Sequence, residues 1–249
     1  MSIRDQEDLK GLRRVGKFVS DTLHAMKRRA RAGMTTRELD EFAAGLFRKH
    51  GARSAPRITY NFPGYTCISV GDEVAHGIPN DTVLKAGDLV NIDVSAELNG
   101  FFADTGHSFQ LEPHSEQVQS LVRSCLDVQR SVISRIRAGM KINQIGRMIH
   151  QGARDKGYNV IRNLSSHGTG RALHEYPTDI LNYRDKNDRR ILAEGQVITI
   201  EPFLSMGDEF VSTQRDGWTL RTPNGSLTAQ HEHTLVVTRD EPILVTYLN

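Results

Sequence analysis

Two aspartates, Asp93 and Asp104, lie on either side of an Asn99-Gly100 pair that separates two apolar-rich runs. Asn-Gly is typical of the two-residue turn of a β-hairpin. With this pair as the turn, the numbers of cross-strand partners sum to 199, so Asp104 faces Ser95. Because side chains alternate along a strand, Asp93 and Asp104 are diagonal neighbours on one face. The hairpin therefore predicts two carboxylates within reach of one shared cation.

The apolar residues around these two carboxylates predict that their face of the hairpin is at least partly buried. Burial penalises two like charges, and a divalent cation would relieve the repulsion, as would a proton or an arginine. A solvated sheet face, or one aspartate that caps a turn, is the alternative that the hairpin alone leaves open.

An internal repeat runs through the chain. Three pairs of similar segments occur in the same order: 31–34 with 137–140, 76–79 with 174–177, and 84–93 with 192–201. Their nearly constant offset indicates two structural halves, about 1–110 and 111–249, fused into one domain.

The repeat adds two acidic residues to the pair on the hairpin. Glu201 occupies the position of Asp93 in the second copy, and Glu232 lies among apolar and β-branched residues of a later strand-like run. Two halves related by a pseudo-twofold axis would bring the four carboxylates together. Two divalent ions would balance their charge, so we predict a dinuclear metal site.

The remaining ligand candidates are histidines. His167 begins a His-Gly-Thr-Gly segment, although a lone histidine beside glycine is more often a loop or core residue. His76 and His174 are repeat partners in His-x-x-Pro and are predicted to flank the site as a matched pair. For the ambiguous His107, His231 and His233 we expect structural or supporting roles.

Helical and strand-like segments occur in separate groups along the chain. Apolar periodicity predicts helices over 9–30, from the Thr35/Glu38 capping box to Gly51, from Ser115 to 136, and over a shorter segment that ends near Gly157. The strand-like runs are 66–70, 89–97, 101–109, 196–203, 231–238 and 243–248. This grouping predicts an α+β fold rather than alternating βαβ units.

The composition limits the class of protein. Of 249 residues, 38% are hydrophobic and 25% are charged, and no apolar run approaches the roughly 18 residues of a membrane-spanning helix. The start, MSIRDQEDLK, lacks the apolar region of a secretory signal, and Cys67 and Cys125 are expected to be reduced thiols. A net charge of +2 gives no general argument for nucleic acid. We expect a soluble, intracellular, globular protein.

With these motifs the sequence resembles the type I methionine aminopeptidases, metallopeptidases of the pita-bread family, over essentially its whole length. The segments that carry the resemblance are Ala75–Pro79, Asp93 to Thr105, Ser166–Glu175, Ile200–Pro202 and Gln230–Thr234. It implies one catalytic domain over 1–249, in which two pseudo-twofold halves share a central antiparallel sheet covered by helices.

The resemblance also implies the chemistry and the residues that perform it. The implied metal ligands are Asp93, Asp104, His167, Glu201 and Glu232. They would hold two divalent ions, Co, Mn, Fe or Zn, whose bridging hydroxide hydrolyses the first peptide bond and releases N-terminal methionine. Glu201 would handle the proton of the nucleophile, and His76 and His174 would contact the substrate.

A methionine pocket is implied at positions of three aromatic residues and a thiol, namely Tyr60, Phe62, Cys67 and Trp218. Aromatic residues and thiols are as often part of the hydrophobic core, so a methionine pocket and a purely structural role both stay open. The chain departs from the family pattern in two places. A glycine usual between Tyr60 and Phe62 is missing, and Leu173 stands where some relatives have phenylalanine.

The implied partners are the N-terminal segments of nascent polypeptides. The resemblance implies a monomeric enzyme in the cytoplasm that binds neither specific DNA nor a membrane. The basic run 27–31 is either a contact with ribosomal RNA near the exit tunnel or a solvated helix end.

Two other functions remain possible for this scaffold. A prolidase-like X-Pro peptidase usually carries an extra N-terminal domain, and a non-catalytic binding protein on this scaffold would have lost ligands.

Overall fold

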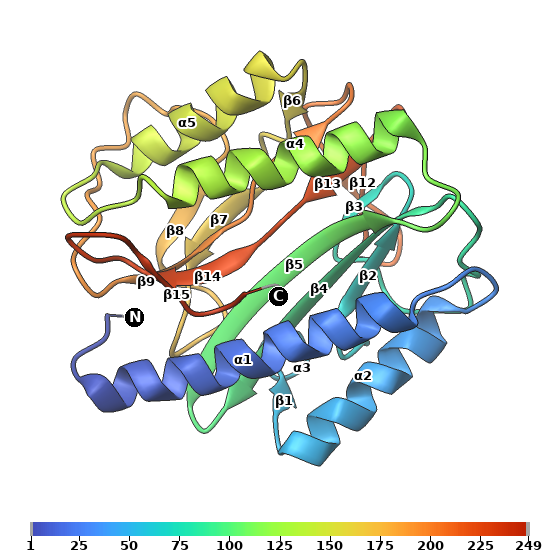
Figure 1. Ribbon diagram of the computed structural model, residues 1–249, viewed down its shortest axis with the longest axis horizontal. Coiled ribbons are helices and arrows are strands. Elements are labelled where there is room, and N and C mark those ends of the chain that lie inside the picture. Colours follow the sequence, from blue (N-terminus) through green and yellow to red (C-terminus); the bar gives the residue numbers. More distant parts are fainter. Residues whose placement is uncertain (1, 248–249) are drawn as a thin grey trace.

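The computed structural model describes residues 2–247, which form helices that lie across antiparallel strands (Figure 1). The helices are α1 (Gln6–Arg29), α2 (Thr36–His50), α3 (Ala55–Tyr60), α4 (Glu116–Ile133) and α5 (Ile142–Asp155). The strands of the first half are β1 (Arg53–Ser54), β2 (Cys67–Val70), β3 (Glu73–Ala75), β4 (Leu89–Leu98) and β5 (Phe101–Gln110). Those of the second half are β6 (Asn159–Val160), β7 (Ser165–Gly168), β8 (Glu175–Leu181), β9 (Val197–Ile200), β10 (Phe203–Ser205), β11 (Ser212–Thr213), β12 (Leu220–Arg221), β13 (Thr228–Gln230), β14 (His233–Val236) and β15 (Ile243–Leu244).

The caps that the sequence signals predict for α2 and α4 are present. The Thr35 side chain accepts from the backbone N–H of Glu38, and the Glu38 carboxylate accepts in return from the N–H of Thr35. Gly51 ends α2 in the left-handed conformation, and Ser115 caps α4. These caps satisfy N–H groups that have no partner within the helix.

The β4–β5 hairpin has the predicted register. Asn99 and Gly100 form the turn, both with positive φ, at 54° and 81°. Ser95 pairs with Asp104 across the two strands. The type I′ turn thus fixes which carboxylates share a face.

The strands form small sheets in place of one continuous sheet, and every pairing within residues 2–247 is antiparallel. One sheet has β4 at its centre, flanked by β1, β2 and β5, and the largest sheet of the second half has the order β15-β14-β9-β7-β8. The isolated bridge between His107 and His231 joins β5 to the second half. The backbone N–H of Glu232 also donates to the carbonyl of Gly106.

The two halves repeat the same local hydrogen bonds. In the first half, Gly33 donates to the carbonyl of Leu84, 2.8 Å away, and in the second half Gly139 donates to Leu192 at the same distance. Both glycines have a φ of 86°. The repeated sequence therefore builds the same turn twice.

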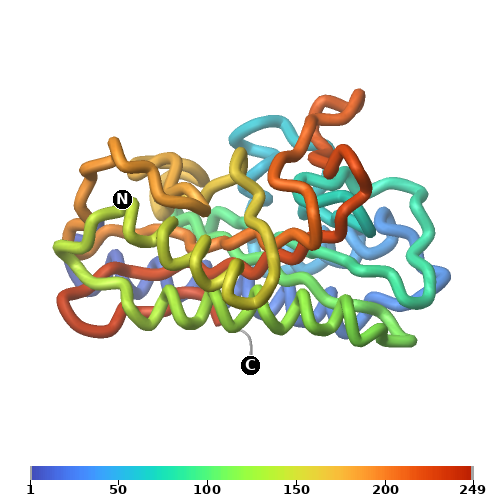
Figure 2. The backbone as a smooth tube through the Cα atoms, turned by 90° about the horizontal axis from the view of Figure 1, so that it is seen from above, coloured from blue at the N-terminus to red at the C-terminus, as the bar shows by residue number. Residues whose placement is uncertain are grey.

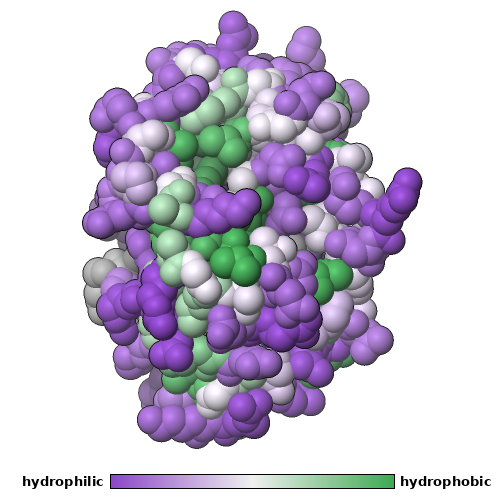
Figure 3. Space-filling model, turned by 90° about the vertical axis from the view of Figure 1, so that its right-hand side faces the viewer, coloured by the Kyte–Doolittle hydropathy of each residue, from purple (hydrophilic) through white to green (hydrophobic). Residues whose placement is uncertain are grey.

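The four long helices α1, α2, α4 and α5 lie on one side of the strands, and the loops around residues 60–80 and 205–225 lie on the other (Figure 2). Each half has an apolar cluster between its helices and strands. Leu12, Leu23 and Met26 of α1 are fully buried in the first, and Leu121 of α4 and Ile145 of α5 are fully buried in the second. At the end of the molecule where α1 ends and α4 begins, apolar side chains reach the surface between hydrophilic ones (Figure 3).

Several predicted boundaries are wrong. The run 196–203 divides into β9 and β10, because Pro202 has no N–H to donate to a ladder. The run 231–238 shortens to β14, α4 ends at Ile133, and β15 covers only Ile243–Leu244 of the run 243–248, whose last residue lies outside the described part. None of the helices in residues 2–247 has both the length and the apolar character needed to span a bilayer.

Candidate metal centre

A pocket of about 700 Å³ lies between the two halves. Its wall includes each residue that the sequence analysis assigned to the site: Tyr60, Phe62, Cys67, His76, Asp93, Asp104, His167, His174, Glu201, Trp218 and Glu232. Parts of the chain that are far apart in sequence therefore meet in one cavity.

The acidic residues enter this pocket from different strands. Asp93 and Asp104 project from β4 and β5, Glu201 directly follows β9, and Glu232 lies between β13 and β14. Three buried oxygens here have no hydrogen-bond partner: Asp93 Oδ1, Asp104 Oδ1 and Glu232 Oε1. A buried polar atom without a partner is costly, so oxygens from both halves that remain unpaired at one place favour a bound cation.

Burial and mutual repulsion change the acidity of these groups. Burial raises the pKa of Asp93 well above its ordinary value, and the charge of Asp104 raises it further. The pKa of Glu201 and that of Glu232 are also raised well above their ordinary range, first by burial and then by Asp104. Without a cation, protons are held here in its place.

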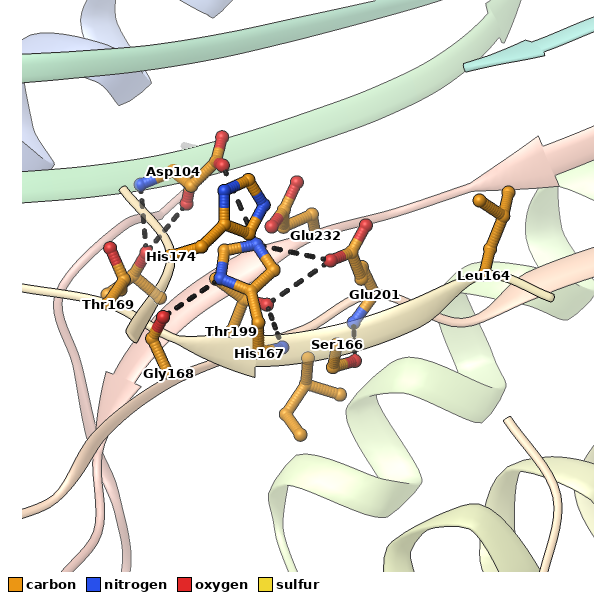
Figure 4. A network of polar contacts seen from close by, with 12 residues as sticks. Asp104, Leu164, Ser166, His167, Gly168, Thr169, His174, Thr199, Glu201 and Glu232 are labelled. Carbon is orange, nitrogen blue, oxygen red and sulfur yellow. Dashed lines mark hydrogen bonds and ion pairs between the residues drawn. The ribbon is translucent and has the colours of Figure 1, made fainter. Parts of the chain in front are cut away.

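His167 presents an unprotonated nitrogen to the carboxylates (Figure 4). Its Nδ1 lies 3.0 Å from the carbonyl oxygen of Gly168, which can only accept, so Nδ1 carries the hydrogen. Burial lowers the pKa of His167 to about 3, so the ring is neutral. The lone pair on Nε2 therefore faces Glu201 Oε1 at 3.5 Å and Asp104 Oδ2 at 4.0 Å.

These donors fit a metal ion. One ligand atom each from Asp104, His167 and Glu232 lie within 4.8 Å of one another, and all three residues are buried. Acceptors that face each other repel unless a cation lies between them, and a histidine whose second nitrogen donates to a carbonyl is the usual arrangement of a metal ligand. Carboxylates with one imidazole suit Mn, Fe, Co or Zn better than Ca.

Two amides that the sequence analysis left without a role support the acidic cluster. The Nε2 of Gln230 donates to Glu232 Oε2 at 3.0 Å, and its Oε1 accepts from Asn91 Nδ2 at 2.9 Å. A Cβ on Gly106 would lie 2.3 Å from Gln230 Oε1, so any larger residue here would displace this amide. Only the position of Gln230 two residues before Glu232, on a strand, could have indicated this role.

The two repeat-related histidines lie at the pocket wall. The ring centroids of His174 and His167 are 4.0 Å apart, and Nδ1 of His174 forms a 2.7 Å hydrogen bond with the hydroxyl of Tyr60. His76 has a positive φ of 55°, and burial lowers its pKa to about 4. The hydroxyl of Tyr60 therefore orients the ring of His174, and His76 is neutral at pH 7.

The predicted apolar wall is present beside the acidic cluster. Phe62 and Trp218 pack edge to face with ring centroids 5.2 Å apart. Cys67 is buried, and burial raises the pKa of its thiol well above the ordinary value. Leu173, at the departure noted in the sequence, also lines the pocket, whereas Tyr60 is 44% exposed at its margin.

His107 and His231 are absent from the pocket lining, and they bond to each other on the helix-covered side of the strands. His233 is also outside the pocket and bonds to the hydroxyl of Thr246. The expectation of structural roles for these histidines agrees with this placement.

The chain is similar in sequence to known metallopeptidases over most or all of its length. The sequence profile of metallopeptidase family M24 matches residues 10–239. Methionine aminopeptidase 2 of Bacillus subtilis is 46% identical over 249 residues, and methionine aminopeptidase of Staphylococcus epidermidis is 43% identical over 250 residues. Each alignment covers 100% of both chains.

Solved structures of methionine aminopeptidases and prolidases have a similar fold. The crystal structure of methionine aminopeptidase from Rickettsia prowazekii superposes with a TM-score of 0.94 at 34% identity, covering 99% of this chain and 100% of that one. Prolidase from Pyrococcus furiosus superposes with a TM-score of 0.79 at 21% identity, and only 66% of its chain is covered. The predicted pita-bread fold is confirmed. From this profile match and these full-length relatives, the chain belongs to metallopeptidase family M24.

Proposed function

We propose that this protein is a metallo-aminopeptidase that removes N-terminal methionine from peptides and nascent proteins. The observation that carries the proposal is the set of buried, unpaired carboxylate oxygens that both halves direct into one pocket. The full-length relatives named methionine aminopeptidase support the same activity.

The proposed ligands are Asp93, Asp104, His167, Glu201 and Glu232, with two divalent ions to balance the four carboxylates. The first two ligands come from the first half and the other three from the second. Neither half alone holds a complete set, which supports a single catalytic unit over the chain.

Bound divalent ions would supply a water molecule of lowered pKa and stabilise the negative charge that develops on the carbonyl oxygen. The protein's own groups do the remaining work. Glu201 is proposed to take the proton of that water, because its carboxylate lies in the same pocket as the other proposed ligands. His76 and His174 are proposed to donate hydrogen bonds to the substrate, with Tyr60 orienting the ring of His174.

The methionine side chain is proposed to occupy the wall formed by Phe62, Cys67 and Trp218, with Tyr60 at its margin. A flexible, polarizable thioether packs well against aromatic rings. The buried thiol of Cys67 stays protonated, so it adds a soft, uncharged surface.

An X-Pro peptidase is the competing function, because prolidases share the fold. That likeness is at 21% identity and concerns the fold alone, whereas the full-length relatives at 43–46% identity are named methionine aminopeptidases. The comparison does not favour the X-Pro activity.

The decisive experiment measures hydrolysis of a Met-Gly peptide and an X-Pro peptide by mass spectrometry. We expect the purified protein to cleave only the Met-Gly peptide, to lose activity with a chelator, and to regain it when Mn, Co, Fe or Zn is added singly. Calorimetric titration of the metal-free protein should give two bound ions.

Asp104→Ala should lower the activity by at least about a hundredfold, because it removes a metal ligand. Asp127→Ala is the matched control, since that carboxylate lies on the surface and pairs only with Lys156. Activity that survives chelation, or cleavage of the X-Pro peptide alone, would rule out the proposal.

A further inference from the structure

Two buried hydroxyl groups lie between the strands that carry His167 and Glu201. They belong to Ser166 of β7 and Thr199 of β9, and both residues are fully buried. Figure 4 shows them beside the two proposed ligands. Bulk water cannot reach this place, so an N–H group that donates to either hydroxyl depends on that hydroxyl.

The backbone of His167 lies outside the regular strand ladders. The ladder between β7 and β9 contains one pair of residues, Gly168 with Ile198, and the pairing of β7 with β8 shifts register between Ser166 and Gly168. The register with β9 would place His167 opposite Thr199. The N–H of His167 donates instead to the side-chain hydroxyl of Thr199, 3.1 Å away.

Glu201 is held in the same way from the other strand. Its backbone N–H donates to the hydroxyl of Ser166 at 2.8 Å. Glu201 directly follows β9 and is itself followed by Pro202, which has no N–H for a ladder. Each strand therefore supplies a hydroxyl to the backbone of the ligand that the other strand carries.

The hydroxyl of Thr199 also joins the two ligands directly. A hydroxyl has one hydrogen, and because the N–H of His167 donates to the oxygen, that hydrogen remains for another acceptor. Thr199 donates it to Glu201 Oε1 at 3.3 Å, and the same oxygen lies 3.5 Å from His167 Nε2. One hydroxyl thus connects the backbone of His167 to the carboxylate oxygen that faces its ring.

The spacing of these two ligand atoms suits one shared cation. A zinc ion, for example, lies about 2.0–2.2 Å from a histidine nitrogen or a carboxylate oxygen, so two of its ligands in a tetrahedron are about 3.4 Å apart. The 3.5 Å between His167 Nε2 and Glu201 Oε1 needs little adjustment. A shift of either strand would change it.

We propose that Ser166 and Thr199 are positioning residues, which hold His167 and Glu201 at the spacing that lets them bind one divalent ion together. The pocket wall described above includes neither residue, so both act through the ligands. This inference rests on the proposed function, because it takes His167 and Glu201 as metal ligands.

The first test compares two variants of Thr199. Thr199→Val keeps the shape of the side chain and removes the hydroxyl, whereas Thr199→Ser keeps the hydroxyl and removes the methyl group. Thr199→Val should weaken binding of Mn²⁺ to the metal-free protein by about tenfold in a calorimetric titration, and Thr199→Ser should retain most of the affinity. A side chain that only fills space gives the reverse order. That order, or equal affinities in the two variants, would overturn the proposal.

A second measurement needs neither metal nor activity. Amide hydrogen exchange in the metal-free protein, followed by NMR, reports the N–H groups of His167 and Glu201 separately. Thr199→Val should speed exchange at His167 by at least about threefold relative to the other amides of β9, and Ser166→Ala should do so at Glu201. Unchanged relative rates would overturn the proposal.

Thr222→Val is the matched control. The side chain of Thr222 is also buried, and its hydroxyl donates to the carbonyl oxygen of Ser226 at 2.9 Å, outside the pocket wall. This variant should lower the melting temperature about as much as Thr199→Val and leave the affinity for Mn²⁺ unchanged. If it weakens Mn²⁺ binding equally, destabilisation alone explains the effect and the proposal fails.

Failure of this proposal can be told apart from failure of the proposed function. A wild-type protein that binds no Mn²⁺ and leaves the Met-Gly peptide intact would end both. Normal binding and cleavage by the wild type, with no effect of Thr199→Val, would end the positioning role alone.

Discussion

The guanidinium of Arg171 lies 3.8 Å from the centre of the Phe101 ring and binds the buried carboxylate of Asp8. It also donates to the carbonyl oxygen of Gly100 at 3.2 Å. Arg171 belongs to the loop that separates His167 from His174. The loop is thereby fastened both to the β4–β5 turn and to α1.

Replacing Arg171 should therefore impair the site from a distance. Arg171→Ala leaves the Asp8 carboxylate short of one partner, which we expect to cost about 1–3 kcal/mol in the free energy of unfolding. A loosened His174 should lower kcat by about tenfold with a smaller change in KM. Thermal unfolding and peptide kinetics measure both effects. Arg239→Ala, which breaks an exposed ion pair with Glu194, should change stability by less than about 0.5 kcal/mol and serves as the control.

The metal-free protein should lose stability as the pH rises above neutrality. The folded-state pKa values of Asp93, Glu201 and Glu232 are raised by burial, so the folded state binds more protons than the unfolded chain. Stability therefore falls as the pH rises from the ordinary carboxyl pKa towards the raised folded-state values, and measurements above about pH 7 keep the histidines of the unfolded chain neutral. Urea unfolding of chelated protein at several pH values measures the slope. Asp93→Asn should flatten it, and a slope of opposite sign would contradict the assignment.

Gly106→Ala should weaken metal binding without removing any proposed ligand. The added Cβ displaces the Gln230 amide that donates to Glu232. Loss of such a supporting hydrogen bond typically reduces metal affinity by about tenfold or more. Gly45→Ala is the matched control, because its Cβ in α2 meets no atom within 4 Å and should stabilise the helix by about 0.5–1 kcal/mol. Calorimetric titration of both variants should separate them, and equal affinities would refute the role of Gly106.

The stability of the protein should depend on which residue occupies position 99, because the backbone there has a positive φ. Asn99→Ala places an alanine at a positive φ and should cost about 1–2 kcal/mol of unfolding free energy. Asn99→Gly should be tolerated, because glycine adopts this conformation without strain. Chemical denaturation of the two variants makes the comparison, and an equal loss in both would mean that the turn does not depend on φ at this position.

The hairpin also explains why so much of the site was predictable. The Asn99-Gly100 turn fixes the register of ten paired residues on each strand, and with it the shared face of Asp93 and Asp104. The repeat then located Glu201 by comparison with Asp93. Both inferences used local patterns whose geometry is fixed by the backbone.

Contacts that depend on long-range packing were not predictable in the same way. Nothing local to His107 indicates that its ring meets His231, 124 residues later, or that Lys27 of α1 completes the group. The hydrogen bond from Asn91 to Gln230 likewise arises only when β4 and the second half meet. Pro202 shows the opposite case, since its missing N–H is a local signal that should have divided the predicted strand 196–203.

Because the acidic cluster is divided between the halves, a cation bound there would hold the two halves together as well as take part in the chemistry. It adds to the hydrogen bonds along the seam between the halves, among them the backbone bond from Glu232 to Gly106 and the bonds of the Thr234 hydroxyl with the backbone of Asp104. Chelation should accordingly speed amide hydrogen exchange first along that seam, where β5 meets residues 231–234, and later in the helices.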